Sequence, residues 1–327
     1  MNILVSGGCG FIGSNFIRYM LAKYPDYRIV NVDKLTYAGN LKNLEEIENN
    51  DRYRFYQVDI ANYSSLLQVF KNWYGFEIVI NFAAESHVDR SILEYSKEFI
   101  DSNIVGVFNF LEIIKKYKVK KYVQVSTDEV YGSLEDDGKF TEETYLKPSS
   151  LYSATKTSAD LIALSYYHTF KIPVVVSRCS NNYGAFQYPE KLIPLMITNL
   201  LEGKKLPVYG KGINVRDWIH VLDHCRALDT LLHYGRVGEC YNVGGGNEWQ
   251  NIEIVKFIID YLGENFNMIE FVRDRLGHDY RYAMDYSKIN SEFGWKPLIS
   301  FADGLKDTIE WYQKNTDWWQ PLKKTTI

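Results

Sequence analysis

Two short segments contain side chains whose types and spacing could carry out chemistry, and the first contains Tyr152 and Lys156. These residues stand four positions apart in a stretch with helical character, and a helix places residues i and i+4 on one face. A nearby ammonium group favours the phenolate, so we expect Lys156 to lower the pKa of Tyr152 toward the range where a general base works best. Beside a nicotinamide cofactor, this phenol could remove the proton of an alcohol as hydride leaves.

The second segment is the run Ser126-Thr127-Asp128-Glu129, which precedes the first by a turn-rich loop. Adjacent carboxylates can hold different protonation states, because one charge raises the pKa of the other. Such a pair offers an acid and a base, and together they could remove water from a substrate whose oxidised carbon has acidified its neighbour. The alternative is a capping box, in which Glu129 bonds back to a helix N-terminus. The spacing alone leaves both interpretations open.

The elements that must position these residues alternate along the first 180 residues. Short apolar runs typical of strands occur at 3–5, 28–32, 54–58, 78–82, 122–125 and 174–177, and amphipathic stretches lie between them at 11–24, 64–73, 102–117 and 151–170. Strands that alternate with helices predict a parallel sheet with helices on both faces. We therefore expect an α/β fold with a Rossmann-like doubly wound sheet, and ligands at the carboxyl ends of its strands.

The alternation breaks after about residue 180, where short Gly, Pro and Asn clusters interrupt the chain. We expect residues 1–180 to form an NAD-binding domain and residues 181–327 to form mainly a smaller α+β substrate-binding lobe. Residues 213–230 and 239–243 are candidates to rejoin the sheet as a late helix and strand. The boundary between the two parts is therefore expected to be discontinuous.

A glycine-rich turn, Gly7-Gly8-Cys9-Gly10-Phe11-Ile12-Gly13, follows the first strand and opens the first helix. Its glycines permit a tight turn and close backbone approach to a pyrophosphate, which then rests on the helix N-terminus. Asp33 ends the second strand, where a carboxylate can bond a ribose 2′-hydroxyl and repel a 2′-phosphate, so NAD is favoured over NADP. Lys34 weakens that exclusion slightly. Two later strand ends add cofactor candidates: Asp59, Ile60, Phe82, Ala83 and Ala84.

The bulk composition excludes several classes of protein. The 46% hydrophobic and 24% charged residues are typical of a soluble globular chain, and the net charge of −4 gives no footprint for nucleic acid or an anionic membrane. No apolar run approaches the roughly 20 residues of a membrane span, and no signal peptide is apparent, so we expect a cytoplasmic protein. The four cysteines lack metal-ligand spacing, and the pair His220 and His224 lacks a third ligand nearby, so no metal is expected.

The position of Tyr152 and Lys156 after a sheet strand resembles the extended short-chain dehydrogenase/reductase superfamily. The resemblance narrows to the NAD-dependent sugar epimerases and dehydratases, and within them to the dTDP-glucose 4,6-dehydratase family. It is carried, in the expected order over nearly the whole chain, by residues 32–40, 82–91, 126–132, 179–184, 186–194, 214–220, 241–245 and 273–282. One departure is Ala185, where family members usually have proline. Without the proline the turn is less constrained, and we expect the chain to lose about 0.4–1 kcal/mol of stability.

The resemblance implies a lyase that converts dTDP-glucose to dTDP-4-keto-6-deoxyglucose in three steps. Thr127, Tyr152 and Lys156 would serve oxidation at C4, Glu129 would remove the C5 proton, and Asp128 would protonate the C6 hydroxyl as water leaves. Hydride would then return to C6. The resemblance also implies a homodimer, with the helices at 102–117 and 151–170 paired across a two-fold axis.

The resemblance implies two sets of binding residues. The cofactor set is Gly7, Gly10, Phe11, Ile12, Gly13, Asp33, Lys34, Leu35, Thr36, Asp59, Ile60, Phe82, Ala83, Ala84, Ser86, Ser102, Tyr152, Lys156 and Asn182. The nucleotide-sugar set is Ser86, Thr127, Asn181, Lys191, Leu192, Pro207, Tyr209, Arg216, Asn251, Arg273, His278, Asp279 and Tyr280. Arg216 with either Arg273 or Arg275 could clamp phosphates, although Arg216 could instead form an ion pair with Asp217 or Asp223.

Four other functions remain as alternatives, and the first is a 4,6-dehydratase that acts on another nucleotide sugar. An epimerase needs only the core of Thr127, Tyr152 and Lys156, and gives no task to the pair Asp128 and Glu129. A UDP-glucuronate decarboxylase needs no acid for a C6 hydroxyl and would need a cation for the C6 carboxylate. A non-catalytic NAD-sensing protein predicts loss of the catalytic residues, all of which are present.

Overall fold

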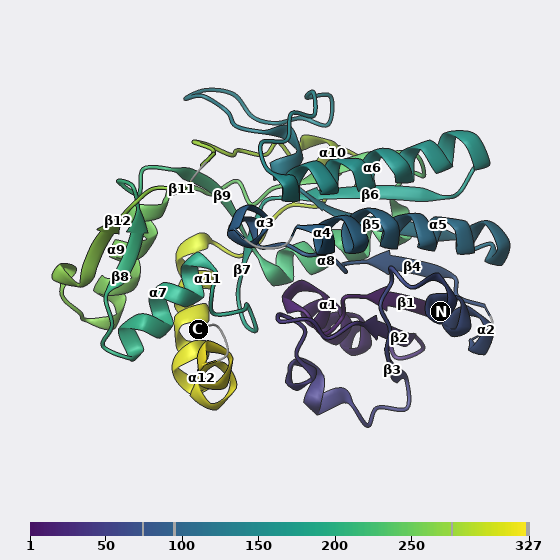
Figure 1. Cartoon of the computed structure of the whole chain (residues 1–327), viewed down its shortest axis with the longest axis horizontal. Coiled ribbons are helices and arrows are strands. Elements are labelled where there is room, and N and C mark those ends of the chain that lie inside the picture. The colour runs from purple at the N-terminus through teal and green to yellow at the C-terminus, as the bar shows by residue number, and fades with distance from the viewer. Residues whose placement is uncertain (74, 94–95, 276, 325–327) are drawn as a thin grey trace.

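The computed structural model describes residues 1–73, 75–93, 96–275 and 277–324, and a seven-stranded parallel sheet forms its centre (Figure 1). The strand order is β10-β6-β5-β4-β1-β2-β3. The strands are β1 (Asn2–Ser6), β2 (Arg28–Asp33), β3 (Tyr53–Gln57), β4 (Ile78–Asn81), β5 (Lys121–Thr127), β6 (Val174–Cys179) and β10 (Cys240–Val243). The predicted α/β fold with a doubly wound sheet is confirmed, because each apolar run is long enough for a strand covered on both faces.

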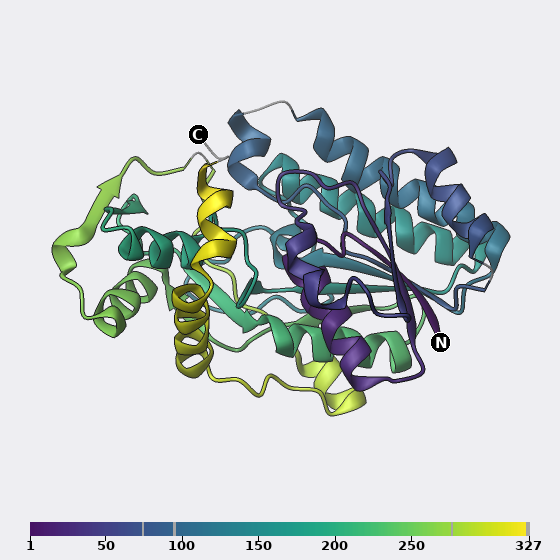
Figure 2. The same cartoon turned by 90° about the horizontal axis from the view of Figure 1, so that it is seen from below.

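Helices cover both faces of this sheet (Figures 1 and 2). On one face lie α1 (Phe11–Lys23) and α8 (Val221–Tyr234), which pack on each other; α1 also packs on β1, and α8 packs on β5 and β6. The other face carries α2 (Tyr63–Asn72), α5 (Gly106–Tyr117) and α6 (Leu151–Phe170), with a core that includes Phe110 and Ala163. The long helix α6 begins with a reciprocal cap, in which the side chains of Ser150 and Ser153 accept from each other's backbone amides.

The late return to the sheet occurs, with one difference from the sequence prediction. Strand β10 pairs with β6, and α8 packs on α1. Residues 213–230 were expected as a helix, but their first part forms β9 (Val215–His220), and α8 begins only at Val221. The helical expectation was wrong there because the strand is determined by pairing with distant residues 181–183 and 248–250, which local spacing cannot reveal.

The remaining chain forms a second lobe with its own core around Trp218, Ile258 and Tyr312. A three-stranded sheet joins β7 (Asn181–Tyr183), β9 and β11 (Glu248–Gln250), and β8 (Leu206–Tyr209) pairs in parallel with β12 (Ile269–Val272). The helices of this lobe are α7 (Leu192–Leu201), α9 (Asn251–Leu262), α11 (Phe301–Lys314) and α12 (Thr316–Lys324). Figure 1 shows this lobe beside the carboxyl ends of the main strands.

The shorter elements complete the chain. They are η1 (Leu41–Ile47), α3 (Val88–Leu93), α4 (Lys97–Ile100), η2 (Asp101–Val105), η3 (Asp128–Tyr131), η4 (Phe266–Met268) and α10 (Ser287–Phe293). Of these, η3 begins directly at the end of β5 with Asp128 and Glu129, the pair that the sequence singled out. Within the described ranges, no helix has both the length and the apolar character needed to cross a bilayer.

Candidate active site

The glycine-rich turn after β1 leaves room for a ligand at the start of α1. Gly7 has a φ of +70°, and a Cβ placed on it would lie 2.5 Å from the backbone nitrogen of Ala83. A Cβ on Gly13 would lie 2.3 Å from the carbonyl oxygen of Gly7, so both positions require glycine. The N-cap residue Gly10 offers no side chain, and the first residues of α1 line a cavity. The free amides of this helix N-terminus suit a diphosphate.

Asp33 lies at the end of β2, on the rim of the same cavity. Its carboxylate accepts hydrogen bonds from the amides of Cys9 at 2.9 Å and Leu35 at 2.8 Å, which fix its orientation. Burial raises its pKa, and the two amide bonds oppose that shift. Lys34 turns instead to Asp59, with 2.8 Å between Nζ and Oδ2. The residues present therefore fit an adenine dinucleotide whose ribose hydroxyls meet a carboxylate.

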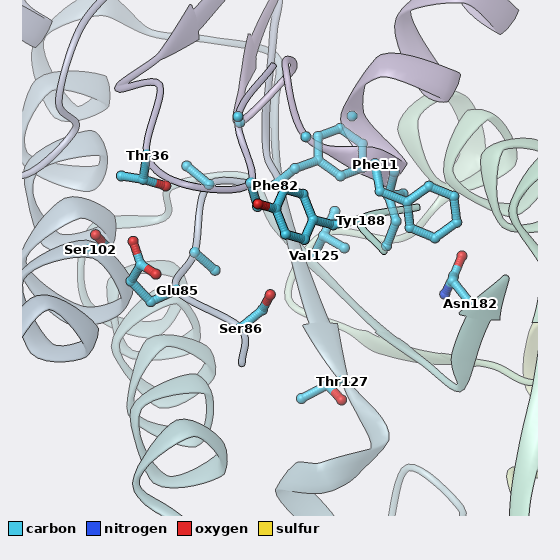
Figure 3. Close-up of a pocket in the computed structure, with 18 of the residues that line it drawn as sticks. Phe11, Thr36, Phe82, Glu85, Ser86, Ser102, Val125, Thr127, Asn182 and Tyr188 are labelled. Carbon is cyan, nitrogen blue, oxygen red and sulfur yellow. The ribbon is translucent and has the colours of Figure 1, made fainter. Parts of the chain in front are cut away.

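The cavity has a volume of about 320 Å³ and runs from this cradle to the end of β5. Figure 3 shows Thr36, Glu85 and Ser102 grouped at one side, with Asn182 at the opposite side and Thr127 at a third position. Of the predicted cofactor residues, only Leu35 lies outside the lining. Sequence reasoning missed the lining residues Val32, Tyr37, Ala38, Gly39, Val58, Glu85, Val125, Ser126, Cys179, Ser180, Gln187, Tyr188 and Glu190.

The predicted catalytic residues Thr127, Asp128, Glu129, Tyr152 and Lys156 all line this cavity. Helix α6 packs on β5 and η3, which brings its first two turns against the strand end. Lys156 donates a 2.7 Å hydrogen bond from Nζ to the carbonyl oxygen of Val125. The two segments that the sequence singled out therefore meet at one end of the cavity.

The electrostatics of Tyr152 differ from the sequence expectation. The pKa of the phenol is raised well above its ordinary value, because burial and the nearby carboxylates Glu129 and Asp128 outweigh a hydrogen bond with Thr127. The pKa of Lys156 is lowered by burial. The prediction of a phenol pKa lowered by the lysine was wrong for the free protein, because helical spacing says nothing of desolvation.

Asp128 and Glu129 are held in different surroundings although they are neighbours in sequence. Asp128 is buried, and its pKa is raised well above the ordinary value by burial and then by the charge of Glu129. Its Oδ1 accepts from Thr127 Oγ1 at 3.0 Å, and Oδ2 has no hydrogen-bond partner among the described residues. Burial also raises the pKa of Glu129, but the cations Arg216, Lys191 and Arg275 act against it. The pKa is thus raised for both carboxyls, and more cations oppose the shift at Glu129 than at Asp128, so Asp128 is the better proton donor of the two.

The capping alternative for Glu129 is not what the structure contains. The N-cap of η3 is Thr127, whose side chain accepts from the amide of Glu129 at 3.3 Å. In the reciprocal box Ser126 would be the cap, but its Oγ has no hydrogen-bond partner among the described residues. The Glu129 carboxylate is thus available to the cavity.

The predicted nucleotide-sugar residues divide into two groups. Ser86, Thr127, Asn181 and Lys191 line the cavity, and Lys191 donates to the carbonyl oxygen of Ser86 at 3.2 Å. The others lie outside its lining: Leu192, Pro207, Tyr209, Arg216, Asn251, Arg273, His278, Asp279 and Tyr280. They belong to the second lobe and the segment that follows β12.

The arginines of the second lobe are placed unequally. Arg216 donates to the carbonyl oxygens of Val215, Tyr280 and Asp279 rather than to Asp217 or Asp223, so the ion-pair alternative for it does not apply. Arg273 is exposed, whereas Arg275 forms a two-point ion pair with Asp89 on α3 and acts on Glu129. Of the two arginines that sequence reasoning left open, Arg275 is the one whose charge acts on a cavity residue, Glu129.

The turn at Ala185 makes contacts with α1 and with the second lobe. Asn15 on α1 donates to the carbonyl oxygen of Ala185 at 3.0 Å. The ring of Phe186 packs on Trp311, with centroids 4.7 Å apart, and beneath the guanidinium of Arg18. Phe186 has a φ of +68°, so this strained turn is held by packing.

Comparison with known proteins places these observations in context. A family model described as GDP-mannose 4,6 dehydratase matches residues 4–308. A dTDP-glucose 4,6-dehydratase of Neisseria meningitidis is 49% identical, covering 97% of this chain and 95% of that protein. A crystal structure of dTDP-glucose 4,6-dehydratase from Bacillus anthracis in complex with NAD is 55% identical, with a TM-score of 0.93, and covers 98% of this chain and 99% of that one.

A second solved structure contains a nucleotide as well. It is a dTDP-glucose 4,6-dehydratase from Streptomyces venezuelae with NAD and dTDP bound. It is 47% identical, covers 98% of this chain and all of that one, and has a TM-score of 0.95. Across these relatives the match extends over both lobes.

Proposed function

The chain belongs to the GDP-mannose 4,6 dehydratase family and, within it, to the dTDP-glucose 4,6-dehydratases, and we propose that it dehydrates dTDP-glucose to dTDP-4-keto-6-deoxyglucose with bound NAD. One observation carries this proposal: Asp128 and Glu129 lie beside Tyr152 in one cavity, and the surroundings of the two carboxyls differ. A dehydration needs one proton donor and one proton acceptor, and the surroundings of the two carboxyls supply one of each.

The oxidation falls to Tyr152, Lys156 and Thr127. Tyr152 accepts the proton of the C4 hydroxyl, Lys156 supplies the positive charge that its phenolate needs, and Thr127 orients the hydroxyl. NAD, when bound on the glycine turn and Asp33, accepts the hydride of C4 and later provides the hydride for C6. The cofactor is thus regenerated without a second substrate.

The elimination falls to Glu129 and Asp128. Oxidation at C4 acidifies the C5 proton, and Glu129 removes it, because Arg216, Lys191 and Arg275 favour its carboxylate form against the effect of burial. Asp128, whose pKa is raised, gives its proton to the C6 hydroxyl, which leaves as water. The pKa is raised for both carboxyls, but three cations oppose the shift at Glu129, so Asp128 is the better proton donor of the two and Glu129 the better proton acceptor.

The cations around Glu129 also suit the diphosphate of the substrate. Lys191 lines the cavity, and Arg216 is held in place by three carbonyl oxygens. Arg275 is tied to Asp89, and a phosphate can compete for its fork of donors. We therefore propose Arg275, rather than Arg273, as the second arginine at the diphosphate.

An epimerase of the same fold is the alternative. It would need Tyr152, Lys156 and Thr127 but would leave the buried Asp128 without a reason. Burying a carboxyl whose pKa is raised destabilises the folded protein, so its retention favours a chemical task. A decarboxylase would likewise leave Asp128 without a C6 hydroxyl to protonate.

Incubation with dTDP-glucose in D2O, without added reductant, tests the proposal. A 4-keto-6-deoxy product with deuterium at C5, detected by NMR and mass spectrometry, is expected. A product that keeps its C6 hydroxyl would establish epimerisation instead. Because the cofactor is regenerated, the reaction should run for many turnovers on the NAD that the protein carries.

We propose that the nucleotide-sugar lobe comprises mainly residues 181–327 and the NAD-binding part comprises residues 1–180 with the return around 213–243.

We also propose a cytoplasmic homodimer. Phe108 on α5 and Leu161 and Phe170 on α6 are exposed on adjacent helices, and a second copy could cover them. Sedimentation of the wild-type protein and of Leu161→Glu tests this: a dimer that the charge leaves intact would place the interface elsewhere.

A further inference from the structure

A buried ion pair lies one helical turn beyond the catalytic lysine and is not used by the reaction steps above. Asp160 on α6 is fully buried, and its Oδ2 lies 3.0 Å from Nε of Arg178 on β6, which is 3% exposed. Residues 156 and 160 are separated by four positions, so their side chains share one helix face. We propose that Asp160 and Arg178 form a positioning pair that keeps Lys156 in its ammonium form during catalysis.

The first argument is the environment of Lys156. Its side chain is buried, and its Nζ donates a hydrogen bond to the carbonyl oxygen of Val125. Burial favours the neutral amine, and the groups that oppose this are Asp160 on the same helix and Cys179 on β6. The pKa of the Cys179 thiol is raised to about 12, so this thiol is neutral at physiological pH. Asp160 is thus the carboxylate that supports the charge of Lys156.

The second argument is the environment of Asp160. A carboxylate buried this deeply needs a cation beside it to offset the loss of its hydration. Arg178 provides that cation, and a guanidinium stays charged at any working pH. Asp160 Oδ1 has no hydrogen-bond partner among the described residues, so the contact with Arg178 is made through Oδ2.

The third argument is that Arg178 also contacts η3, the turn that carries the two carboxyls. Its Nη1 donates to the hydroxyl of Tyr131 at 2.9 Å, and that hydroxyl donates to Asn242 Oδ1 at 2.7 Å. Tyr131 ends η3, the turn that carries Asp128 and Glu129. Arg178 therefore joins the helix of Lys156 to the turn of the carboxyl pair, and its own position is fixed from both.

The proposal rests on the proposed oxidation by Tyr152 and Lys156, and it predicts the consequence of removing the anion. With Asp160→Asn, the ammonium of Lys156 loses its support while the charge of Arg178 remains nearby. The alkaline limb of the pH–rate profile for C4 oxidation should then move to lower pH by roughly one unit or more. For a shift of one unit, formation of bound NADH from dTDP-glucose should slow about threefold at a pH midway between the wild-type and variant limbs, and about tenfold at a pH above both.

Two further variants keep this test decisive. Asp160→Asn leaves Arg178 buried and unpaired and can fail to fold, so the double variant Asp160→Asn with Arg178→Met removes both charges. It must show the same direction of shift. Tyr131→Phe is the matched control, since it removes a hydrogen bond to Arg178 and keeps the ion pair; its alkaline limb should match the wild type.

A readout independent of turnover is the titration of Lys156 itself, followed by NMR of isotope-labelled lysine side chains with Lys156→Met to assign the signal. The lysine should titrate at lower pH in the double variant than in the wild type. An unchanged titration and an unchanged alkaline limb in a folded variant would overturn the positioning role. Failure of the wild type to form NADH from dTDP-glucose would instead overturn the proposed function, so the two failures are distinct.

Discussion

Replacement of Glu129 by glutamine separates the oxidation from the elimination. The substitution keeps size and shape, so Thr127 can still cap η3 through the amide of residue 129. An amide cannot abstract the C5 proton, and a positioned general base contributes about 100- to 10,000-fold. We therefore expect loss of dehydration in that range. Oxidation at C4 should persist, so enzyme-bound NADH should accumulate instead of appearing only transiently.

The structure also predicts how this variant changes the pH dependence of oxidation. The charge of Glu129 is the second cause, after burial, of the raised pKa values of both Asp128 and Tyr152. Its removal should lower the pKa of Tyr152. Since the phenol must lose its proton to act as a base, the acid limb of oxidation should move to lower pH.

The assay is stopped-flow absorbance of reduced nicotinamide, combined with analysis of the quenched sugar. Glu310→Gln is a suitable control, because Glu310 bonds Lys314 and Tyr261 on the exposed side of α11, and it should behave as wild type. Full dehydration by Glu129→Gln would refute the reasoning and return Glu129 to a structural role. Loss of NADH formation together with dehydration would show that the residue serves oxidation as well.

Three further predictions follow from the same geometry. Asp128→Asn should slow loss of the C6 hydroxyl and yet raise the melting temperature at neutral pH. A carboxyl whose pKa is raised in the folded protein contributes stability below its ordinary pKa of 3.8, and this stability is lost as pH rises through the folded pKa. An unchanged melting temperature at neutral pH would contradict that sign. Gly13→Ala should cost about 1–3 kcal/mol of stability and most of the retained NAD, measured by thermal unfolding and by release of nucleotide from denatured protein, because its Cβ would meet the Gly7 carbonyl at 2.3 Å. Asp33→Ser should weaken NAD binding and narrow the preference over NADP in calorimetric titrations, since the carboxylate that repels a 2′-phosphate is gone; an undiminished preference would place NADP exclusion elsewhere.

The strands and the cofactor cradle could be predicted from the sequence because their determinants are local. A buried parallel strand is a short apolar run, and Gly7, Gly10 and Gly13 follow the first of these at a spacing that a tight turn requires. The same holds for Tyr152 and Lys156, whose spacing of four residues is a property of one helix. The sheet then brings each strand end to one edge, so the cavity follows from the order of the elements.

The second lobe could not be predicted in the same way. Whether Arg273 or Arg275 faces the cavity depends on the path of the chain after β12 and on Asp89, which lies 186 residues earlier. The strand β9 likewise exists because it pairs with β7 and β11. Both are decided by partners distant in sequence, and neither leaves a periodic signal in its own segment.

The electrostatics of Tyr152 show that the spacing of two residues does not by itself determine the pKa of the phenol. Spacing indicates that a cation is near, and from that alone the phenol should lose its proton readily. The fold adds burial, Glu129 and Asp128, and all three hold the proton on the phenol. Lys156, itself buried, keeps its charge only if an anion supports it, and Asp160 lies on the same helix face. The chemistry expected of Tyr152 and Lys156 therefore also depends on Asp160, which lies four positions beyond Lys156 on the same helix.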